Sequence, residues 1–489
     1  MQPPAPPDRS DGQRRPMATS ASAARVPSIL ASLVVLGVTL AWFNSGIEAV
    51  RNASWEDLQR HPELVLRPPW NLLRAFASRD GDEHLYYEYS RLALGEAADL
   101  DYVARRHQGE GEALRRIVRS GPGSRLPYRD FPFEYPPLAL LPMLAPRLVA
   151  DTLPAYRLGF GALMAVLACA TVLLAAGVGR RIAPEHGARV IRRAAWLVLA
   201  FGPILVSRFD VFPAFLAAAA LYAWASRRPV LAGLALGLAA ATKLYPVFLL
   251  PIWLAPLLGR GREGWRDGAR LCLGALVGGA LPALPFLALC PEPFARSVLL
   301  YGARPFQVES LVGGLLLLVG GPGAASSGFG SDNALAPPTL LAVWPLALPA
   351  AVFWLAWLAH REARRGPDGE PARVARLCAS TAAALACILC TSKVLSPQFL
   401  LWTLPAVALL PGRGGTRVFG LAVAAGVFTQ AYYPYLYEGV AAGERGPLAL
   451  LLVRNALLAA LAVRAAQAAG AGSGAAGSPG LSAASARPG

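Results

Sequence analysis

The chain has 489 residues, of which 55% are hydrophobic and 16% are charged. A soluble domain usually carries about 25% charged residues, so this composition excludes a soluble enzyme, a disordered chain and a disulfide scaffold. The formal net charge of +16 would suggest a nucleic-acid partner in a soluble protein. Here the basic residues stand in short clusters between apolar runs, which indicates orientation in a membrane and no nucleic-acid partner.

The chain begins with a polar, Pro-rich segment, 1–26, which we expect to be a disordered cytoplasmic tail. The apolar run behind it could be a signal peptide, but no convincing cleavage site follows, so an uncleaved span is favoured. Over 27–465 we predict an all-α polytopic membrane domain, since each span needs about 20 apolar residues. The predicted spans are 27–48, 156–178, 194–208, 210–226, 229–243, 244–259, 271–290, 338–359, 377–392, 396–411, 416–433 and 447–465.

The arginines between the spans predict the orientation of the domain. Five arginines lie in 179–193, four in 259–270 and five in 360–376. With twelve spans and a cytoplasmic N-terminus, all three connections face the cytoplasm, as the positive-inside rule requires. Two apolar pieces, 137–150 and 311–320, would break this pattern as spans, so we predict short helices at the outer interface.

The first outer loop, 49–155, is the one long polar segment. Between Arg51 and Glu134 it carries 13 arginines and 14 acidic residues, so it is charged yet nearly neutral. Loops longer than about 15 residues are usually functional or disordered. Its helical periodicity and aromatic residues favour a folded cap. The C-terminal segment 466–489 is rich in Ala, Gly, Ser and Pro and predicts a second disordered, cytoplasmic tail.

Carboxylates and aromatic residues alternate in this outer loop. Asp80, Asp82 and Glu83 come before three tyrosines, and Asp130 and Glu134 lie in a second aromatic stretch. The tyrosines that we consider as binding residues are Tyr86 and Tyr135. A carboxylate can accept the proton of a sugar hydroxyl, and aromatic faces stack on sugar rings. The alternative is a solvated, charged loop.

Arg208 and Asp210 stand between two predicted spans, separated by Phe209. Ionisable groups at that depth are costly, and they are usually functional or paired. Both residues are therefore candidates for binding a substrate. The alternative is a local ion pair between them that ties two helix ends together.

The chain has 44 arginines and two lysines, Lys243 and Lys393. Each lysine ends one apolar run, and a proline three or four residues later opens the next. Lysine is a compact point charge whereas arginine is a planar fork, so a phosphate bound as a point charge would favour lysine. The alternative is a lysine that extends its ammonium group to the interface.

A further outer loop follows the seventh span. It contains a cation at Arg304, an amide at Gln307 and a carboxylate at Glu309, and Gln398 follows the second lysine. These groups could bind a polar substrate or simply fold the loop. Six cysteines and five histidines show no metal-binding pattern, and the pair Cys387 and Cys390 lies within a predicted span, which favours packing over redox chemistry.

Outward carboxylates and outward cations at membrane depth indicate a lipid phosphate and a hydroxyl nucleophile. Removing a proton and neutralising a phosphate leaving group are the two demands of glycosyl transfer from a phospholipid. The predicted cytoplasmic loops lack a Walker lysine, a G-x-G-x-x-G and a D-x-D motif.

The order of these motifs resembles a known family. D-x-x-x-Y-x-x-Y from Asp82 and P-Y-R-D-F-x-F-E-Y-P-P-L from Pro127 resemble the first outer loop of GT-C fold glycosyltransferases. Four further motifs resemble those of glycosyltransferase family 87. They are the Arg208-Phe-Asp210 junction, A-x-x-K-x-Y-P (240–246), R-P-x-Q-x-E-S (304–310) and S-K-V-x-S-P-Q-F-L-L-W (392–402). The whole resemblance covers about 27–465.

The resemblance implies a membrane-embedded, inverting transferase that takes a hexose, mannose in characterised relatives, from a polyprenyl phosphate to a lipid-linked or glycan acceptor. It implies an active site on the outer face and no metal or other cofactor. By motif position the general base is Asp82, with Asp80, Asp130 and Glu134 as fallbacks. The implied phosphate-binding residues are Lys243, Lys393, Arg208 and Arg304, and the substrate-binding candidates are Tyr86, Tyr135, Asp210, Gln307, Glu309 and Gln398.

The chain departs from the family pattern at one place. About 30 residues, Glu96 to Leu126, separate the two motifs of the first outer loop, where a short link is expected. Two other functions stay open: a transporter or flippase of lipid-linked sugars, which would carry ionisable residues in mid-span and repeated halves, and a non-catalytic membrane subunit.

Overall fold

The computed structural model describes residues 81–470, apart from 107–122, 124, 329, 366–368 and 435. The predicted N-terminal tail and first span lie outside the described residues, as does Asp80. The last helix continues to Gly470, so the predicted start of the second tail, 466–470, is helical.

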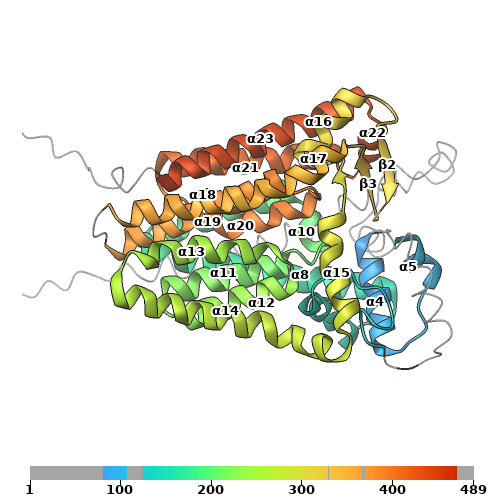
Figure 1. The fold of residues 1–489 in the computed structure, drawn as a ribbon, viewed down its shortest axis with the longest axis horizontal. Coiled ribbons are helices and arrows are strands. Elements are labelled where there is room, and N and C mark those ends of the chain that lie inside the picture. Colours follow the sequence, from blue (N-terminus) through green and yellow to red (C-terminus); the bar gives the residue numbers. More distant parts are fainter. Residues whose placement is uncertain are drawn as a thin grey trace, which may run out of the picture.

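The body of the protein is a bundle of helices that run along one axis (Figure 1). They are α8 (Leu153–Ile182), α9 (His186–Phe201), α11 (Val211–Ala225), α12 (Pro229–Thr242), α13 (Leu249–Leu258), α14 (Gly261–Leu289), α18 (Ala347–Ala363), α19 (Glu370–Thr391), α20 (Leu404–Val407), α21 (Gly412–Tyr432) and α23 (Arg445–Gly470). Each predicted span from 156–178 onward contains one of these helices, which confirms the all-α polytopic fold class.

Within the described residues, five helices are long and apolar enough to cross a membrane: α8, α14, the continuous run Pro338–Ala363, α19 and α23. Five further apolar helices are shorter. Helices α9, α14 and α19 begin inside the connections that the sequence assigned to arginine-rich loops. Arginine is a good helix former with a long apolar stem, so a helix continues through it past the apolar layer.

Short elements gather at one end of the bundle, on the right in Figure 1. They are α4 (Asp82–Leu94), α5 (Leu100–Arg106), η2 (Pro137–Ala139), α7 (Leu140–Leu144), η3 (Ala145–Leu148), α10 (Ile204–Ser207), α15 (Pro291–Ala303), β1 (Phe306–Gln307), α16 (Leu311–Gly320), β2 (Ala325–Gly328), β3 (Ser331–Ala334), α17 (Pro338–Val343), η5 (Trp344–Leu346) and α22 (Tyr437–Ala441). The segments 137–150 and 311–320 form short helices here, as expected. The sequence did not predict the antiparallel sheet β1-β3-β2, in which Phe306 and Ala325 both pair with Ala334.

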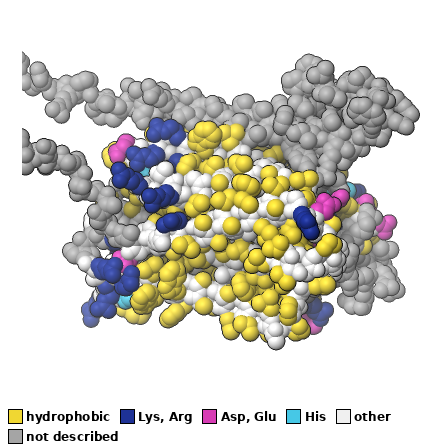
Figure 2. All heavy atoms as spheres, turned by 90° about the horizontal axis from the view of Figure 1, so that it is seen from above, with side chains coloured by type: hydrophobic (Ala, Val, Ile, Leu, Met, Phe, Trp, Pro, Cys, Tyr) yellow, Lys and Arg dark blue, Asp and Glu magenta, His cyan; other side chains and the backbone are white. Residues whose placement is uncertain are grey.

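Charge separates the two ends of the bundle. In Figure 2 a broad apolar belt covers the middle, and most of the visible Lys and Arg side chains gather at its left end. At that end lie the connections between α13 and α14 and between α18 and α19. The described chain therefore has an arginine-rich end and, opposite to it, the end with the short elements.

Two helices break at the lysines. Helix α12 ends at Thr242, and the 3-10 helix η4 (Tyr245–Phe248) begins two residues after Lys243. Helix α19 ends at Thr391, and the 3-10 helix η6 (Pro397–Thr403) opens with a proline. A proline has no N–H to donate and disfavours the helical backbone conformation of the residue before it. The prolines in the sequence therefore predict both breaks.

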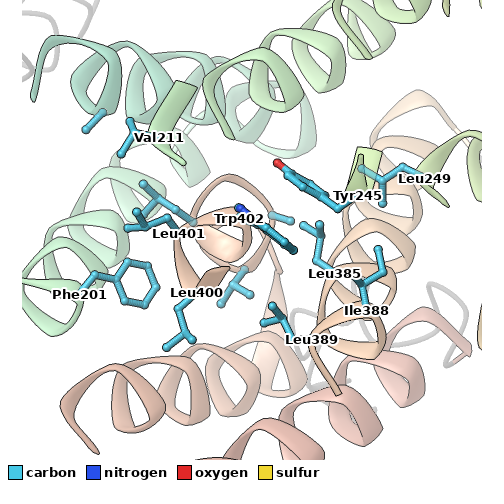
Figure 3. Close-up of a cluster of buried hydrophobic side chains, with 14 of the residues drawn as sticks. Phe201, Val211, Tyr245, Leu249, Leu385, Ile388, Leu389, Leu400, Leu401 and Trp402 are labelled. Carbon is cyan, nitrogen blue, oxygen red and sulfur yellow. The ribbon is translucent and has the colours of Figure 1, made fainter. Parts of the chain in front are cut away.

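Helix η6 lies in the middle of the bundle, and Trp402 is its central contact (Figure 3). The Trp402 ring is stacked on Tyr245 at 4.1 Å and on Phe399 at 4.2 Å between centroids. Leu385, Ile388 and Leu389 of α19 lie next to it in the same buried cluster. This aromatic stack joins the two broken helices and fixes the residues that follow the lysines.

Helices α12 and α14 touch backbone to backbone. A Cβ added at Gly237 would lie 2.2 Å from the carbonyl oxygen of Ala275, and one at Gly274 would lie 2.1 Å from that of Val230. Small residues allow this close approach, which is how membrane helices gain packing contacts. Any larger side chain in the seam must push the two helices apart.

We expect Gly237→Leu to destabilise the protein by about 3 kcal/mol, the upper end of overpacking effects in cores. The matched control is Gly420→Leu on α21, where an added Cβ meets nothing within 4 Å. Thermal unfolding in detergent measures both variants. Equal apparent Tm values for the two would contradict the tight seam.

Candidate functional site

A pocket of about 530 Å³ lies among the short elements, at the end opposite the arginine-rich one. This volume is in the range of small-molecule sites, although the lining is more polar than usual. Its lining residues are Gly81, Asp82, Arg106, Pro203, Ile204, Ser207, Arg208, Gln307, Glu309, Gly330, Ser331, Ser396, Pro397, Gln398, Gln430, Tyr433, Pro434, Tyr437 and Glu438. Segments that are far apart in the sequence thus build one polar cavity.

Asp82 is the first residue of α4 and lies on the wall of the pocket. The positive end of a helix favours a carboxylate in its first turn. The Asp82 Oδ2 atom lies 3.4 Å from Nε of Arg208, and Oδ1 lies 3.5 Å from Nη2 of Arg106. The side chain is 21% exposed, so this carboxylate faces two cations and remains accessible to a ligand.

Arg208 is buried and joins the pocket wall to the bundle. Besides Asp82, its guanidinium lies 4.0 Å from Oε2 of Glu83 and donates a hydrogen bond of 2.7 Å to the hydroxyl of Tyr433. Each of these partners comes from a distant segment. The ion pairs of Arg208 are therefore with the start of α4, more than 100 residues earlier in the chain.

Asp210 has a different partner from its neighbour Arg208. It is fully buried, and its Oδ1 accepts hydrogen bonds from Nζ of Lys243 at 2.6 Å and from Nε1 of Trp402 at 2.8 Å. The local Arg208–Asp210 pair that the sequence left open is thus replaced by two long-range pairs. Asp210 and Lys243 both lie outside the pocket lining.

Aromatic rings enclose the ammonium group of Lys243. Its Nζ lies 4.5 Å from the ring centroid of Phe399, 5.1 Å from that of Phe209 and 5.5 Å from that of Trp402. Cation–π contacts of this kind strengthen when they are desolvated. The space between these rings and the Asp210 carboxylate suits a compact ammonium group, which explains the lysine at this position.

Lys393 and Arg304 lie beside the pocket rather than on its wall. The Nζ of Lys393 donates a hydrogen bond of 2.6 Å to the carbonyl of Gly302 near the end of α15. Partial burial lowers the pKa of Lys393. Arg304 is half-buried directly after α15. Both cations therefore flank the loop that carries Gln307.

Gln307 connects two loops of the pocket wall. Its backbone N–H donates to the carbonyl of Lys393, and its Oε1 accepts from Leu395 N at 3.0 Å and from the Ser396 hydroxyl at 3.3 Å. Its amide also donates to Oε2 of Glu309 at 3.1 Å. Gln307, Glu309 and the third predicted polar residue of this group, Gln398, all line the pocket.

Glu309 is a buried residue of the pocket wall, and its Oε1 accepts a hydrogen bond of 2.6 Å from Tyr432. Arg454, a fully buried residue of α23, lies 3.9 Å from the same carboxylate. Burial raises the pKa of Glu309 to about 7, although Arg454 and the Tyr432 hydrogen bond act in the opposite direction. This carboxyl group therefore titrates near neutral pH.

This pKa predicts a pH-dependent stability. The pKa of Glu309 in the folded state lies above its ordinary value of 4.5, so its stabilising contribution is complete below about pH 4.5 and is lost as the pH rises through 7. We expect wild type to lose up to about 3 kcal/mol relative to Glu309→Gln between pH 4.5 and 8, since one pKa unit is worth about 1.4 kcal/mol. Thermal unfolding of both proteins across this range measures the difference, which stays constant if Glu309 does not titrate.

The two predicted tyrosines lie in an aromatic cluster behind the pocket. Tyr86 is 1% exposed and packs against Phe160 and Phe209 with centroid distances of 5.4 and 5.5 Å. Tyr135 is half-buried and contacts Phe209 edge to face at 4.9 Å. Both lie outside the pocket lining and support the position of Phe209, between Arg208 and Asp210.

The fallback carboxylates in the second motif also lie outside the lining. Asp130 accepts a hydrogen bond of 2.7 Å from Leu126 N and pairs with Arg129 at 2.8 Å, and the Arg129 bond lowers its pKa. This carboxylate closes a local turn. Glu134 is half-buried next to Tyr135. Of the three described carboxylates that we predicted as candidate bases, Asp82 is the one that lines the pocket.

Sequence reasoning missed several residues of this site. The cluster Tyr432 to Tyr437, at the outer end of a predicted span, was a usable signal because it combines aromatic rings with hydroxyl groups. Arg454 was another, since a charged residue inside an apolar helix needs a partner. Arg106 gave no such signal, because arginines are common along the first outer loop.

A second, smaller cavity of about 230 Å³ lies at the arginine-rich end. Its charged lining residues are Arg227, Arg260, Arg373, Arg376, Glu263, Asp267, Glu362 and Glu370. The two signs balance, and Arg227 pairs with Glu370 at 2.6 Å. This cavity is therefore a weaker candidate than the pocket around Asp82.

Comparison with known proteins finds a match to the family "Glycosyltransferase family 87" over residues 133–397, just over half of the chain. The matched stretch contains Arg208, Asp210, Lys243 and the loop from Arg304 to Glu309, and Asp82 precedes it. No curated protein sequence matches the chain.

Two solved structures are similar, both of ArnT from Cupriavidus metallidurans. The one bound to undecaprenyl phosphate has 15% identity and a TM-score of 0.35. The apo structure has 16% identity and a TM-score of 0.30. In both cases 82% of this chain and 77% of the other are covered.

Proposed function

Because the chain belongs to glycosyltransferase family 87, we propose that it transfers a hexose, with mannose as the first candidate, from a polyprenyl-phosphate sugar to a lipid-linked or glycan acceptor. The reaction takes place on the outer face of the cell membrane and inverts the anomeric carbon. It needs no metal ion or other cofactor.

The observation that carries this proposal is the pair of Asp82 and Arg208 on one pocket wall, 3.4 Å apart. Glycosyl transfer from a phospholipid needs a base for the acceptor hydroxyl and a cation for the departing phosphate. The pair supplies one group of each kind. A pocket that only held a neutral sugar would not require the buried guanidinium.

The reaction follows from these two groups. Asp82 takes the proton of the acceptor hydroxyl while the oxygen of that hydroxyl forms a bond to the anomeric carbon, on the face opposite the phosphate. The bond between that carbon and the phosphate oxygen breaks, and polyprenyl phosphate leaves with the electron pair. Arg208 offsets the negative charge that develops on the phosphate.

Arg208 is the first candidate for the phosphate because it lines the pocket and its planar fork suits a phosphate. Lys393 and Arg304 flank the neighbouring loop and are the next candidates. Lys243 holds Asp210, so it would act on the phosphate only through the charge of the whole cluster.

The rest of the lining suits a sugar. Gln307 and Gln398 offer amide groups, and Tyr433 and Tyr437 add aromatic faces with hydroxyls. Amides donate and accept hydrogen bonds, as sugar hydroxyls do. Glu309 is a buried acceptor in the same wall. Asp210, Tyr86 and Tyr135 support this wall from behind.

Orientation supports an outward-facing site. The pocket lies at the end opposite the arginine-rich connections (Figures 1 and 2). If those connections face the cytoplasm, as the positive-inside rule requires, both termini are cytoplasmic and the pocket opens to the outer face.

The decisive experiment incubates the purified protein with labelled polyprenyl-phosphate mannose and a panel of membrane-lipid acceptors, with and without EDTA. We expect a labelled, inverted product at equal rates in both conditions. If another hexose is transferred, the proposed donor sugar is wrong and the proposed reaction type stands. If no donor supports transfer and the protein instead translocates lipid-linked sugar in proteoliposomes, the protein is a flippase and the proposed function is wrong.

A further inference from the structure

Arg106 brings a second cation to the proposed base. It lies at the end of α5, within the segment Glu96–Leu126 that departs from the family pattern. Of that segment the structure describes 96–106, 123 and 125–126. Arg106 lines the pocket, and its Nη2 lies 3.5 Å from Oδ1 of Asp82, the oxygen that does not face Arg208.

Three contacts fix the position of Arg106. Its Nη2 donates to the hydroxyl of Tyr102 at 3.3 Å, and its guanidinium lies 5.7 Å from the Tyr102 ring. Tyr102 in turn stacks on His84 of α4 with a centroid distance of 3.9 Å, which holds α5 against α4. At the pocket rim Gly330 approaches the backbone of Arg106, since a Cβ added at Gly330 would lie 3.2 Å from the carbonyl oxygen of Arg106.

We propose that Arg106 is a positioning residue for Asp82, and that helix α5 contributes to catalysis by placing this second guanidinium at the carboxylate. The inference rests on the proposed function of Asp82. Arg106 holds Oδ1 in place, so the carboxylate presents a fixed orientation to the acceptor hydroxyl. Its guanidinium also lies within ion-pair distance of the carboxylate, at 3.5 Å from Oδ1.

The other groups around Asp82 do not replace this charge. Glu83 and Tyr86 come from the same helix, Tyr433 and Tyr135 from neighbouring segments, and Glu309 and Glu438 from the pocket wall. Each of these is acidic or neutral. Among the described pocket residues, Arg106 and Arg208 are the cations, so losing Arg106 removes half of that positive charge.

The test is the pH profile of kcat/KM for Arg106→Gln. Removing a unit charge within about 4 Å of a carboxylate makes its protonation easier, so we expect the acidic limb to move up by about one pH unit. On that limb kcat/KM falls about tenfold, and above it the loss is smaller. Arg106→Lys, which restores the charge, returns the limb to within a few tenths of its wild-type position.

A second variant separates this role from folding. Tyr102→Phe keeps the ring stack on His84 and removes the hydroxyl that Arg106 contacts, so a smaller shift in the same direction is expected. The matched control is Arg296→Gln, an exposed arginine of α15 paired with Glu292, which leaves the profile unchanged. A uniform loss of activity without a limb shift in Arg106→Gln overturns the proposal, as does an unaltered profile.

A further measurement needs no turnover, so it remains informative if the proposed function itself fails. Infrared difference spectra assign the carboxyl band that is lost in Asp82→Asn. The pH midpoint of that band is then compared between wild type and Arg106→Gln. A rise of about one unit supports the electrostatic contact between Arg106 and Asp82, and an equal midpoint overturns it, whatever the protein transfers.

Discussion

Asp82→Asn lowers kcat/KM for glycosyl transfer by about 10³-fold, since a positioned general base is worth roughly 10² to 10⁴. Asparagine has the shape of aspartate, so the contacts to Arg106 and Arg208 change little in geometry, but it cannot accept the proton of the acceptor hydroxyl. Donor binding should stay within a few-fold of wild type. The measurement is initial-rate kinetics with the labelled donor, together with a donor-binding assay.

The control is Asp267→Asn, a half-exposed residue of α14 at the arginine-rich end that pairs with Arg270. It should retain full activity. If Asp82→Asn stays active while Asp130→Asn or Glu134→Gln is inactive, the base lies in the second motif of the outer loop and the pocket assignment is wrong.

Lys243→Met should destabilise the protein by about 3–5 kcal/mol, the usual effect of removing one partner from a buried ion pair. Methionine keeps the length and the apolar stem, so the loss comes from the charge. Asp210 is fully buried and would retain its Trp402 bond, with its negative charge no longer offset. Chemical unfolding in detergent or thermal unfolding measures the change.

The double variant Lys243→Met with Asp210→Asn tests the cause. Removing both charges should recover most of the lost stability, because no unpaired charge then stays buried. The double-mutant cycle isolates the pairwise energy. If Lys243→Met leaves stability unchanged and weakens donor binding instead, the ammonium binds phosphate and its pairing with Asp210 is secondary.

The sequence was a good guide to the bundle and to its family. Apolar runs located the helices that form the bundle, such as α8, α14, α19 and α23, and arginine clusters separated the two ends. The breaks at Lys243 and Lys393 followed from the prolines behind them, and the short helices in 137–150 and 311–320 followed from charge counting. The resemblance to glycosyltransferase family 87 is confirmed by the family match. These features depend on local composition, so they can be read without knowing the three-dimensional contacts.

The partners of the charged residues could not be predicted in the same way. Asp210 pairs with Lys243, 33 residues away, and with Trp402, 192 residues away, rather than with its neighbour Arg208. Side chains two residues apart at a helix start point in different directions, so the sequence distance misleads. The sheet around Ala334 and the contact of Arg106 with Asp82 likewise depend on the packing of separate loops.

Helix α14 has two sides with opposite tolerance to mutation. Its outward side, with Leu276, Leu281 and Leu284, is mostly exposed and should accept any lipid-soluble side chain in a random substitution library. Its inward side, with Gly274 and Gly278, should accept almost none, because a single added methyl group meets the backbone of α12. Deep mutational scanning would therefore show this helix as a stripe of forbidden positions beside a stripe of silent ones.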